Sequence, residues 1–128
     1  MVKPSRVKTI LAAGALFAAA AGGAITARTL QPSPKAYVLV QIDVTNAGQY
    51  GEYTKLTPAI IEKFGGHFLA RGGRSATLEG PKAPGRIALI EFPGYERAQA
   101  FYNSPEYVSA RKVRAGAAHV QMVLVEGQ

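Results

Sequence analysis

The side chains best suited to chemistry in this sequence are one histidine, two carboxylates and two arginines. The residue is His67, and the imidazole of histidine, with an unperturbed pKa of about 6.5 in model peptides, suits a general acid or base at neutral pH. Glu91 is the carboxylate that we expect beside it, and together they are the candidate catalytic pair. A reaction based on such a pair would proceed by proton transfer and would need no cofactor.

Arg71 and Arg86 are the candidate ligand-binding cations. A guanidinium donates hydrogen bonds in a fork that fits a substrate carboxylate or enolate. For Arg71, an alternative is a salt bridge that fixes the glycine-rich segment after it. The other candidate ligand-binding residues are Asp43, Tyr53, Tyr102 and Tyr107, with Tyr50 near them in the sequence. The tyrosines recur at helical spacing, so packing with a solvated hydroxyl is the competing interpretation.

Other classes of site find little support. The chain has no cysteine, and His67 and His119 stand alone without the spacing of metal ligands, so we expect neither a metal nor a cofactor. No glycine-rich loop follows a strand and opens a helix, as a nucleotide site would need. The basic run 111–114 is typical of a solvated helix end, and without alternating aromatic residues it does not indicate nucleic-acid binding.

The N-terminus indicates export. A basic start precedes an apolar run rich in Ala and Gly, and small residues follow it, as in a signal peptide over residues 1–27. The expected location is therefore periplasmic or secreted. The uncharged stretch 9–27 is also just long enough to span a bilayer, so an uncleaved membrane anchor is the alternative, and only then is a membrane a partner.

The remaining sequence is sufficient for one small domain. The formal net charge of +7 includes three positive charges from residues 1–27, and without them it falls to +4. Residues 28–35 contain two prolines and no periodicity, which indicates a linker. We expect the folded domain to span residues 36–126.

The domain shows four strand patterns and three helix patterns. Strands are expected over 36–44, 67–71, 86–92 and 119–125, where side chains alternate between two faces. A first helix is indicated by Tyr53, Leu56, Ile60 and Phe64 at three- and four-residue spacing, with a kink or break near Thr57 because of Pro58. Two further helices are expected over 95–103 and 105–115, the second capped by Ser104 and opened by Pro105.

This order predicts an α+β, ferredoxin-like βαββαβ domain with a four-stranded antiparallel sheet. The strand over 36–44 should lie beside the strand over 86–92, flanked by the last strand and by the second strand respectively. We expect the helices to cover the all-apolar face. That face would collect these side chains: Val38, Val40, Ile42, Phe68, Ala70, Ala88, Ile90, Phe92, Val120, Met122 and Leu124.

The other face of the sheet combines aliphatic and charged side chains. It would hold Leu39, Leu69, Ile87, Leu89, Val123 and Val125 beside Gln41, Asp43, His67, Arg71, Glu91 and Gln121. So many aliphatic residues rarely face water, and so many charges rarely lie in a closed core. We therefore expect two copies to pack these faces together in a dimeric α+β barrel, with a pocket between the sheets.

Strand directions determine which polar residues should meet. We expect the strands over 36–44 and 86–92 to run parallel, so that Asp43 and Glu91 end at the same edge, where His67 begins and where Gln121 also lies. Arg71 would then lie apart from them, near Arg86. The alternative to an acid–base role is that His67 and Glu91 form an ion pair that satisfies polar groups at the dimer interface.

Four motifs resemble a known family. They are Gly-Gly-His-Phe-Leu-Ala-Arg-Gly-Gly at 65–73, Leu-Glu-Gly at 78–80, Arg-Ile-Ala-Leu-Ile-Glu-Phe-Pro at 86–93 and Ala-Phe-Tyr-Asn-Ser-Pro-Glu-Tyr at 100–107. Together they resemble the uncharacterised family DUF1330 over residues 36–126. That family is similar to the dimeric α+β barrels, which include cofactor-free monooxygenases, lactone isomerases and haem-dependent relatives. The resemblance implies the fold and a homodimer, but no particular reaction.

Two functional hypotheses remain open. The first is an exported dimer that binds a small, anionic organic molecule and acts on it as a cofactor-free enzyme. The second is a non-catalytic binding or structural dimer, in which the same polar residues serve the interface.

Overall fold

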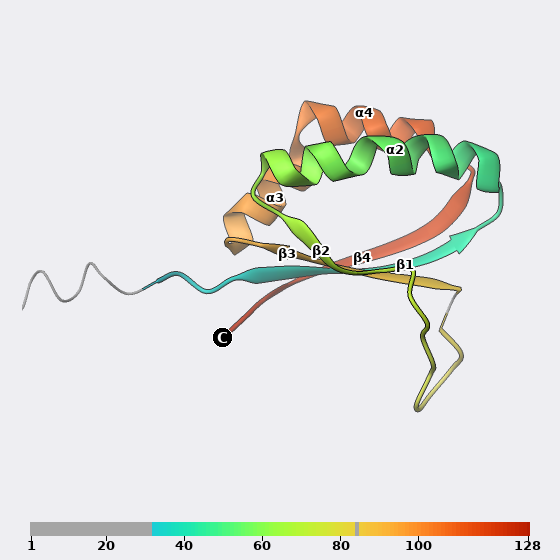
Figure 1. Cartoon of the computed structure of the whole chain (residues 1–128), viewed down its shortest axis with the longest axis horizontal. Coiled ribbons are helices and arrows are strands. Elements are labelled where there is room, and N and C mark those ends of the chain that lie inside the picture. The colour runs from blue at the N-terminus through green and yellow to red at the C-terminus, as the bar shows by residue number, and fades with distance from the viewer. Residues whose placement is uncertain (1–31, 84) are drawn as a thin grey trace, which may run out of the picture. The chain divides into compact units, whose positions relative to one another are not determined.

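The computed structural model describes residues 32–83 and 85–128. The expected signal peptide at 1–27 and the first half of the expected linker, residues 28–31, lie outside the described residues. Residues Ser33–Gln128 form one unit of four strands and three helices (Figure 1). No helix in the described part of the chain is both long enough and apolar enough to cross a membrane.

The four strands are β1 (Ala36–Val44), β2 (His67–Arg71), β3 (Arg86–Phe92) and β4 (Ala118–Glu126). They form one open sheet in the order β2-β3-β1-β4, and every neighbouring pair is antiparallel. The predicted α+β, ferredoxin-like arrangement is therefore confirmed. A parallel pairing of β1 with β3 was wrong. β1 and β2 are joined through a helix and run parallel to each other, and β3 lies between them in the opposite direction.

The three helices are α2 (Ala47–Lys63), α3 (Tyr95–Asn103) and α4 (Pro105–Val113). Asn46 caps α2, because its side-chain oxygen accepts a hydrogen bond from the backbone N–H of Gln49 at 3.1 Å. Ser104 caps α4, with Pro105 at the first helical position as predicted. The expected break at Pro58 was wrong, because α2 continues through this residue as one helix.

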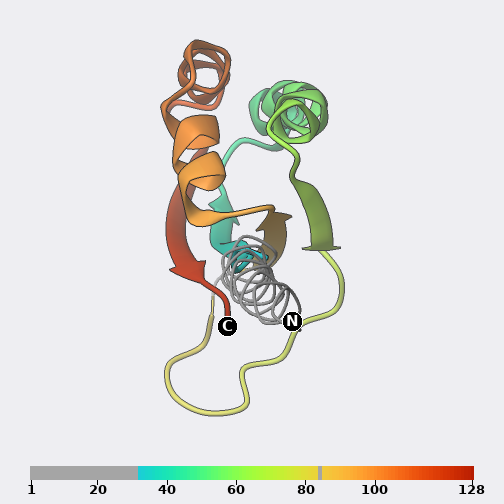
Figure 2. The same cartoon turned by 90° about the vertical axis from the view of Figure 1, so that its left-hand side faces the viewer.

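All three helices lie on the same side of the sheet, and the end view in Figure 2 separates the two layers. The buried face of α2 consists of Tyr50, Tyr53, Thr57 and Ile61. It is rotated from the predicted stripe, since Leu56 remains 44% exposed. Sheet residues of the predicted apolar face, among them Val40, Ile90 and Phe92, pack in the core between the layers.

A bulge in β2 changes which of its residues face the helices. Phe68 lies opposite Ile90, but the register shifts after it, so that Ala70 lies opposite Leu89 and Arg71 lies opposite Ala88. Arg71 therefore shares the helix-covered face with Ala88, and Ala70 shares the open face with Leu89. The predicted faces of Arg71 and Ala70 were therefore wrong, because simple alternation does not allow for an extra residue.

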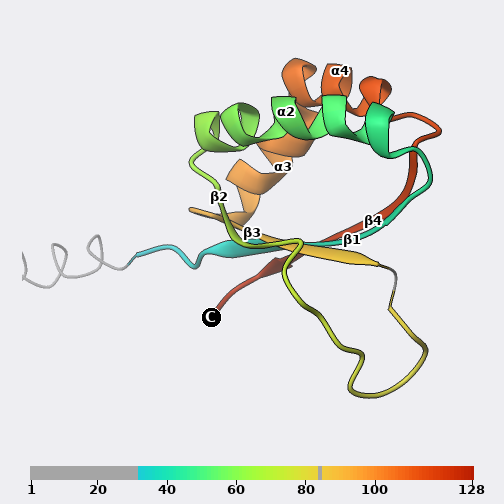
Figure 3. The same cartoon turned by 45° about the vertical axis from the view of Figure 1, so that its right-hand side comes forward.

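The segment between β2 and β3 extends away from the helices, on the open side of the sheet (Figure 3). It begins at Gly72, whose backbone N–H donates to the carbonyl of Ile87 at 3.1 Å. Leu78 in this segment is 96% exposed.

Candidate ligand-binding site

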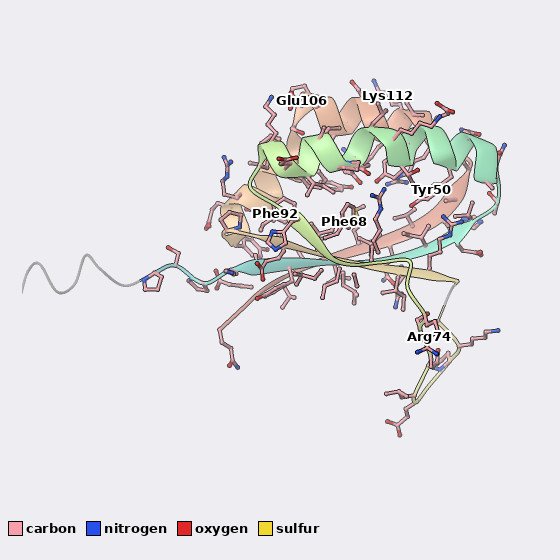
Figure 4. The ribbon with its side chains drawn as sticks, in the orientation of Figure 1. Tyr50, Phe68, Arg74, Phe92, Glu106 and Lys112 are labelled. Carbon is pink, nitrogen blue, oxygen red and sulfur yellow. The ribbon has the colours of Figure 1, made fainter. Side chains whose placement is uncertain are left out.

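A cavity of about 450 Å³ lies between α2 and the sheet. Its floor is formed by Val40, Ile42, Ala88 and Ile90 of the two central strands, and its roof by residues of α2. Figure 4 shows Tyr50 and Phe68 in the space between the two layers. This cavity lies within one chain and is distinct from the pocket that we expect between the sheets of two copies.

Two arginines lie at the rim of the cavity, one on each side of the segment that joins β2 to β3. Arg71 donates a hydrogen bond to the backbone carbonyl of Thr54 at 3.1 Å, and its guanidinium lies 4.5 Å from the centre of the Phe68 ring. The guanidinium of Arg86 lies 5.9 Å from the centre of the Tyr50 ring. The prediction that Arg71 lies near Arg86 is confirmed.

Neither arginine has an acidic partner among the described residues. The four ion pairs found there involve Lys35, Lys55, Lys63 and His67 as the basic members. The lining of the cavity contains both arginines and no carboxylate. The rim therefore carries uncompensated positive charge next to an apolar interior, which favours an anionic group on a largely apolar molecule.

Tyrosine hydroxyls supply the polar groups inside the cavity. The hydroxyls of Tyr53 and Tyr107 are hydrogen-bonded at 2.6 Å, and the Tyr107 hydroxyl donates to Sδ of Met122 at 3.7 Å. Burial raises the pKa of Tyr53 above its ordinary value, and the neighbouring Tyr107 adds to this shift. Burial also raises the pKa of Tyr50. The phenols of Tyr50 and Tyr53 therefore stay protonated at neutral pH and act as hydrogen-bonding groups rather than as anions.

Arg114 is part of this polar group, which the sequence analysis missed. Its guanidinium lies 5.0 Å from the centre of the Tyr53 ring, and its Nε is buried without a hydrogen-bond partner. The basic run 111–114 was interpreted as a solvated helix end, but Arg111 also lies 4.0 Å from the centre of the Tyr102 ring. These arginines lie against tyrosines that are distant from them in the sequence or on another turn of helix. The sequence alone does not show this proximity.

Of the predicted tyrosines, Tyr53 and Tyr107 line the cavity and Tyr102 does not. Tyr102 is 42% exposed and lines a smaller hollow of about 380 Å³ beside α3. Phe101 and Met122 contribute to both spaces and separate them.

The predicted pair of His67 and Glu91 is brought together, but on the open face of the sheet. Nε2 of His67 lies 3.4 Å from a carboxylate oxygen of Glu91, and Nζ of Lys35 lies 3.1 Å from the same oxygen. The hydrogen bond from Lys35 is the main cause that lowers the pKa of Glu91. Neither His67 nor Glu91 lines the cavity under α2.

Asp43 and Gln121 do not join this pair. Because β1 and β3 are antiparallel, Glu91 lies opposite Tyr37 at the start of β1, and Asp43 lies opposite His119 near its other end. The two positions are six residue steps apart along the strand, a distance of about 20 Å. Gln121 pairs with Gln41, which keeps it near Asp43 as expected but far from His67. The predicted cluster of four polar residues is therefore wrong as a unit.

Among residues 32–83 and 85–128, no group of three or more His, Cys, Asp or Glu side chains could hold a metal ion. The arrangement that the described residues do provide is a cavity with cations at its rim and phenols inside.

The family model described as "Domain of unknown function (DUF1330)" matches residues 35–128. The chain belongs to the DUF1330 family. No functionally curated protein shows a significant match to it.

Solved structures share the fold of this DUF1330 domain at low sequence identity. The RPA0582 protein of unknown function from Rhodopseudomonas palustris is 17% identical, with a TM-score of 0.63, over 79% of this chain and 88% of the other. SnoaB from Streptomyces nogalater, described as a cofactor-independent oxygenase, is 8% identical, with a TM-score of 0.55, over 75% and 95%. A hypothetical protein of Arabidopsis thaliana is 14% identical, with a TM-score of 0.53, over 77% and 94%. At these identities the likeness shows the fold alone.

Proposed function

We propose that this DUF1330 protein binds a small organic anion in the cavity between α2 and the sheet. The observation that carries the proposal is the composition of the lining, in which Arg71 and Arg86 meet an apolar floor and no carboxylate. A volume of about 450 Å³ lies within the range of roughly 300–1,000 Å³ typical of small-molecule sites. The anionic group would lie at the rim, and the apolar body would lie against the floor.

Titration with benzoate and benzamide tests the proposal. The two molecules have nearly the same shape, and only benzoate is charged, so tighter binding of benzoate measures recognition of the anion. Arg86→Met should weaken benzoate binding and leave benzamide binding nearly unchanged. Arg74→Met is the matched control, because Arg74 lies in the segment on the other side of the sheet (Figure 4). Equal binding of both molecules by the unmodified protein would exclude a site for anions.

We also propose that two copies associate through the open faces of their sheets. This face exposes Leu39, Leu69, Val123 and Val125 by 38–54%. An apolar surface of this kind, beside polar groups, is typical of an interface. Native mass spectrometry of the purified protein would report the oligomeric state and any ligand that co-purifies.

We propose separately that His67 and Glu91, on the open face of the sheet, act by proton transfer on a molecule held between two copies. Its support is the 3.4 Å contact between the two side chains, which the second copy would shield from water. A non-catalytic role is the second candidate. It is supported by the contact of Glu91 with Lys35, because this ion pair neutralises the carboxylate, as an interface requires. His67→Ala separates the two: retained dimerisation with altered ligand chemistry favours the enzyme, and dissociation of the dimer favours the structural role.

We propose export on the basis of the sequence of residues 1–27. Expression of the full chain in a bacterium, followed by fractionation and mass measurement, tests this. A periplasmic product that lacks about 24–27 residues is the expected result. A full-length product in the membrane would instead support the anchor, and a full-length product in the cytoplasm would exclude export.

A further inference from the structure

Pro58 lies inside α2, where proline usually destabilises a helix. Proline has no backbone N–H, so the carbonyl four residues earlier receives no helical hydrogen bond. That carbonyl belongs to Thr54, a residue that lines the cavity. A proline at this position therefore leaves one backbone acceptor free beside the proposed ligand site.

The free carbonyl of Thr54 is used by Arg71. One terminal nitrogen of the Arg71 guanidinium donates to it at 3.1 Å, and the Thr57 hydroxyl donates to it at 3.4 Å. The guanidinium also stacks 4.5 Å from the centre of the Phe68 ring. Arg71 can make these contacts only because the bulge in β2 turns it toward the helices.

These contacts fix the side chain without neutralising it. A carbonyl and an aromatic ring are both uncharged, and the bond to Thr54 uses one of the five N–H groups of a guanidinium. The others stay available to a ligand. An arginine that is already ordered loses less conformational entropy when it binds an anion than a freely rotating one.

We propose that Pro58 is a positioning residue for anion binding. It frees the Thr54 carbonyl, which holds the Arg71 guanidinium at the rim of the cavity in a binding-ready orientation. The inference rests on the proposed function, because it concerns the same anion site. Pro58 does not line that site and acts on it through Arg71.

Pro58→Ala tests this by restoring an N–H that can donate to the Thr54 carbonyl and compete with Arg71. Alanine also favours the helix, so the variant should fold at least as stably as the unmodified protein. Gly51→Ala is the matched control. It too improves the helix, an added Cβ there meets no atom within 4 Å, and it leaves the Thr54 carbonyl free of a backbone donor.

Two readouts follow the Arg71 side chain and the ligand separately. The first is the NMR signal of the Arg71 Nε–H group without ligand, which is assigned by its loss in Arg71→Lys. The heteronuclear relaxation of this signal reports the mobility of the side chain. The second is the affinity for benzoate and for benzamide. In Pro58→Ala we expect a more mobile Arg71 signal, a benzoate affinity lower by about two- to tenfold, and an unchanged benzamide affinity. In Gly51→Ala all three should match the unmodified protein.

The outcomes are distinguishable. If the Arg71 signal is equally rigid in Pro58→Ala, the positioning role is overturned whether or not benzoate binds. A mobile Arg71 with undiminished benzoate binding also overturns it, but leaves the proposed function intact. If the unmodified protein does not prefer benzoate to benzamide, the proposed function fails, and the role of Pro58 in anion binding fails with it.

Discussion

At the scale of single residues, the cavity keeps its phenols neutral and its cations free. Burial raises the pKa values of Tyr50 and Tyr53, while Arg71 and Arg86 have no acidic partner among the described residues. The sequence predicted the identity of most of these side chains. It also predicted that Arg71 lies near Arg86, but not that Arg71 faces α2, because the bulge in β2 that turns it toward the helices leaves no periodic signal.

Tyr53 should make the protein sensitive to alkali. Its pKa is higher in the folded state than in the unfolded chain. The stabilisation that protonated Tyr53 contributes should therefore be complete below about pH 10, and the free energy of unfolding should fall as the pH rises above that value. Absorbance at 295 nm during alkaline titration should show tyrosine ionisation above pH 10, and Tyr53→Phe should remove part of that late change. The same titration in guanidinium chloride is the control. Identical curves for Tyr53→Phe and the unmodified protein above pH 10 would contradict the assignment.

At the scale of elements, alternation and helical spacing predicted four elements with the same bounds as the structure, namely β1, β2, β3 and α3. The errors come from long-range pairing. Strand direction depends on the crossover through α2, and the side on which Arg71 lies depends on one extra residue in β2. Neither leaves a periodic signal in the sequence. The exposed position of Leu56 has a similar origin, since the rotation of α2 is set by the layer beneath it.

The turn between α2 and β2 should tolerate no side chain at Gly66. A Cβ there would lie 2.6 Å from Cε1 of Phe92 and 2.9 Å from Cγ2 of Ile61, both of which are buried. Gly66→Ala should therefore lower the free energy of unfolding by about 1–3 kcal/mol, as overpacking does. Urea unfolding followed by circular dichroism measures the change. Gly73→Ala is the control, because a Cβ at that position meets nothing within 4 Å; equal losses in both variants would contradict the packing argument.

At the scale of the whole molecule, the sheet presents two different surfaces. One is covered by the chain's own helices, and the other exposes aliphatic side chains around His67 and Glu91. The sequence predicted this asymmetry correctly, since it depends only on alternation along the strands. It did not predict the cavity under α2, because the space there depends on how far the helix layer stands from the sheet.

Val123→Glu tests the proposed association. Val123 is 48% exposed on the open face, so a carboxylate there should change the free energy of unfolding of a single copy only slightly. If two faces pack together, the same carboxylate would be buried without a basic side chain to pair with it. We expect a dimer for the unmodified protein and a folded monomer for the variant, measured by sedimentation velocity. Leu56→Glu, at a similarly exposed site on the outside of α2, should stay dimeric. A monomeric unmodified protein, or a variant that remains dimeric, would refute association through this face.

The spacing of the two rim arginines is set by strand pairing and not by the segment that connects them. Arg71 lies opposite Ala88 within the sheet, and the adjacent bond from Gly72 to Ile87 closes the ladder before the segment leaves it. The chain between these anchored ends can thus be shortened, lengthened or exchanged without moving either guanidinium. A fluorophore or an epitope can therefore be inserted there while the cationic rim keeps its geometry.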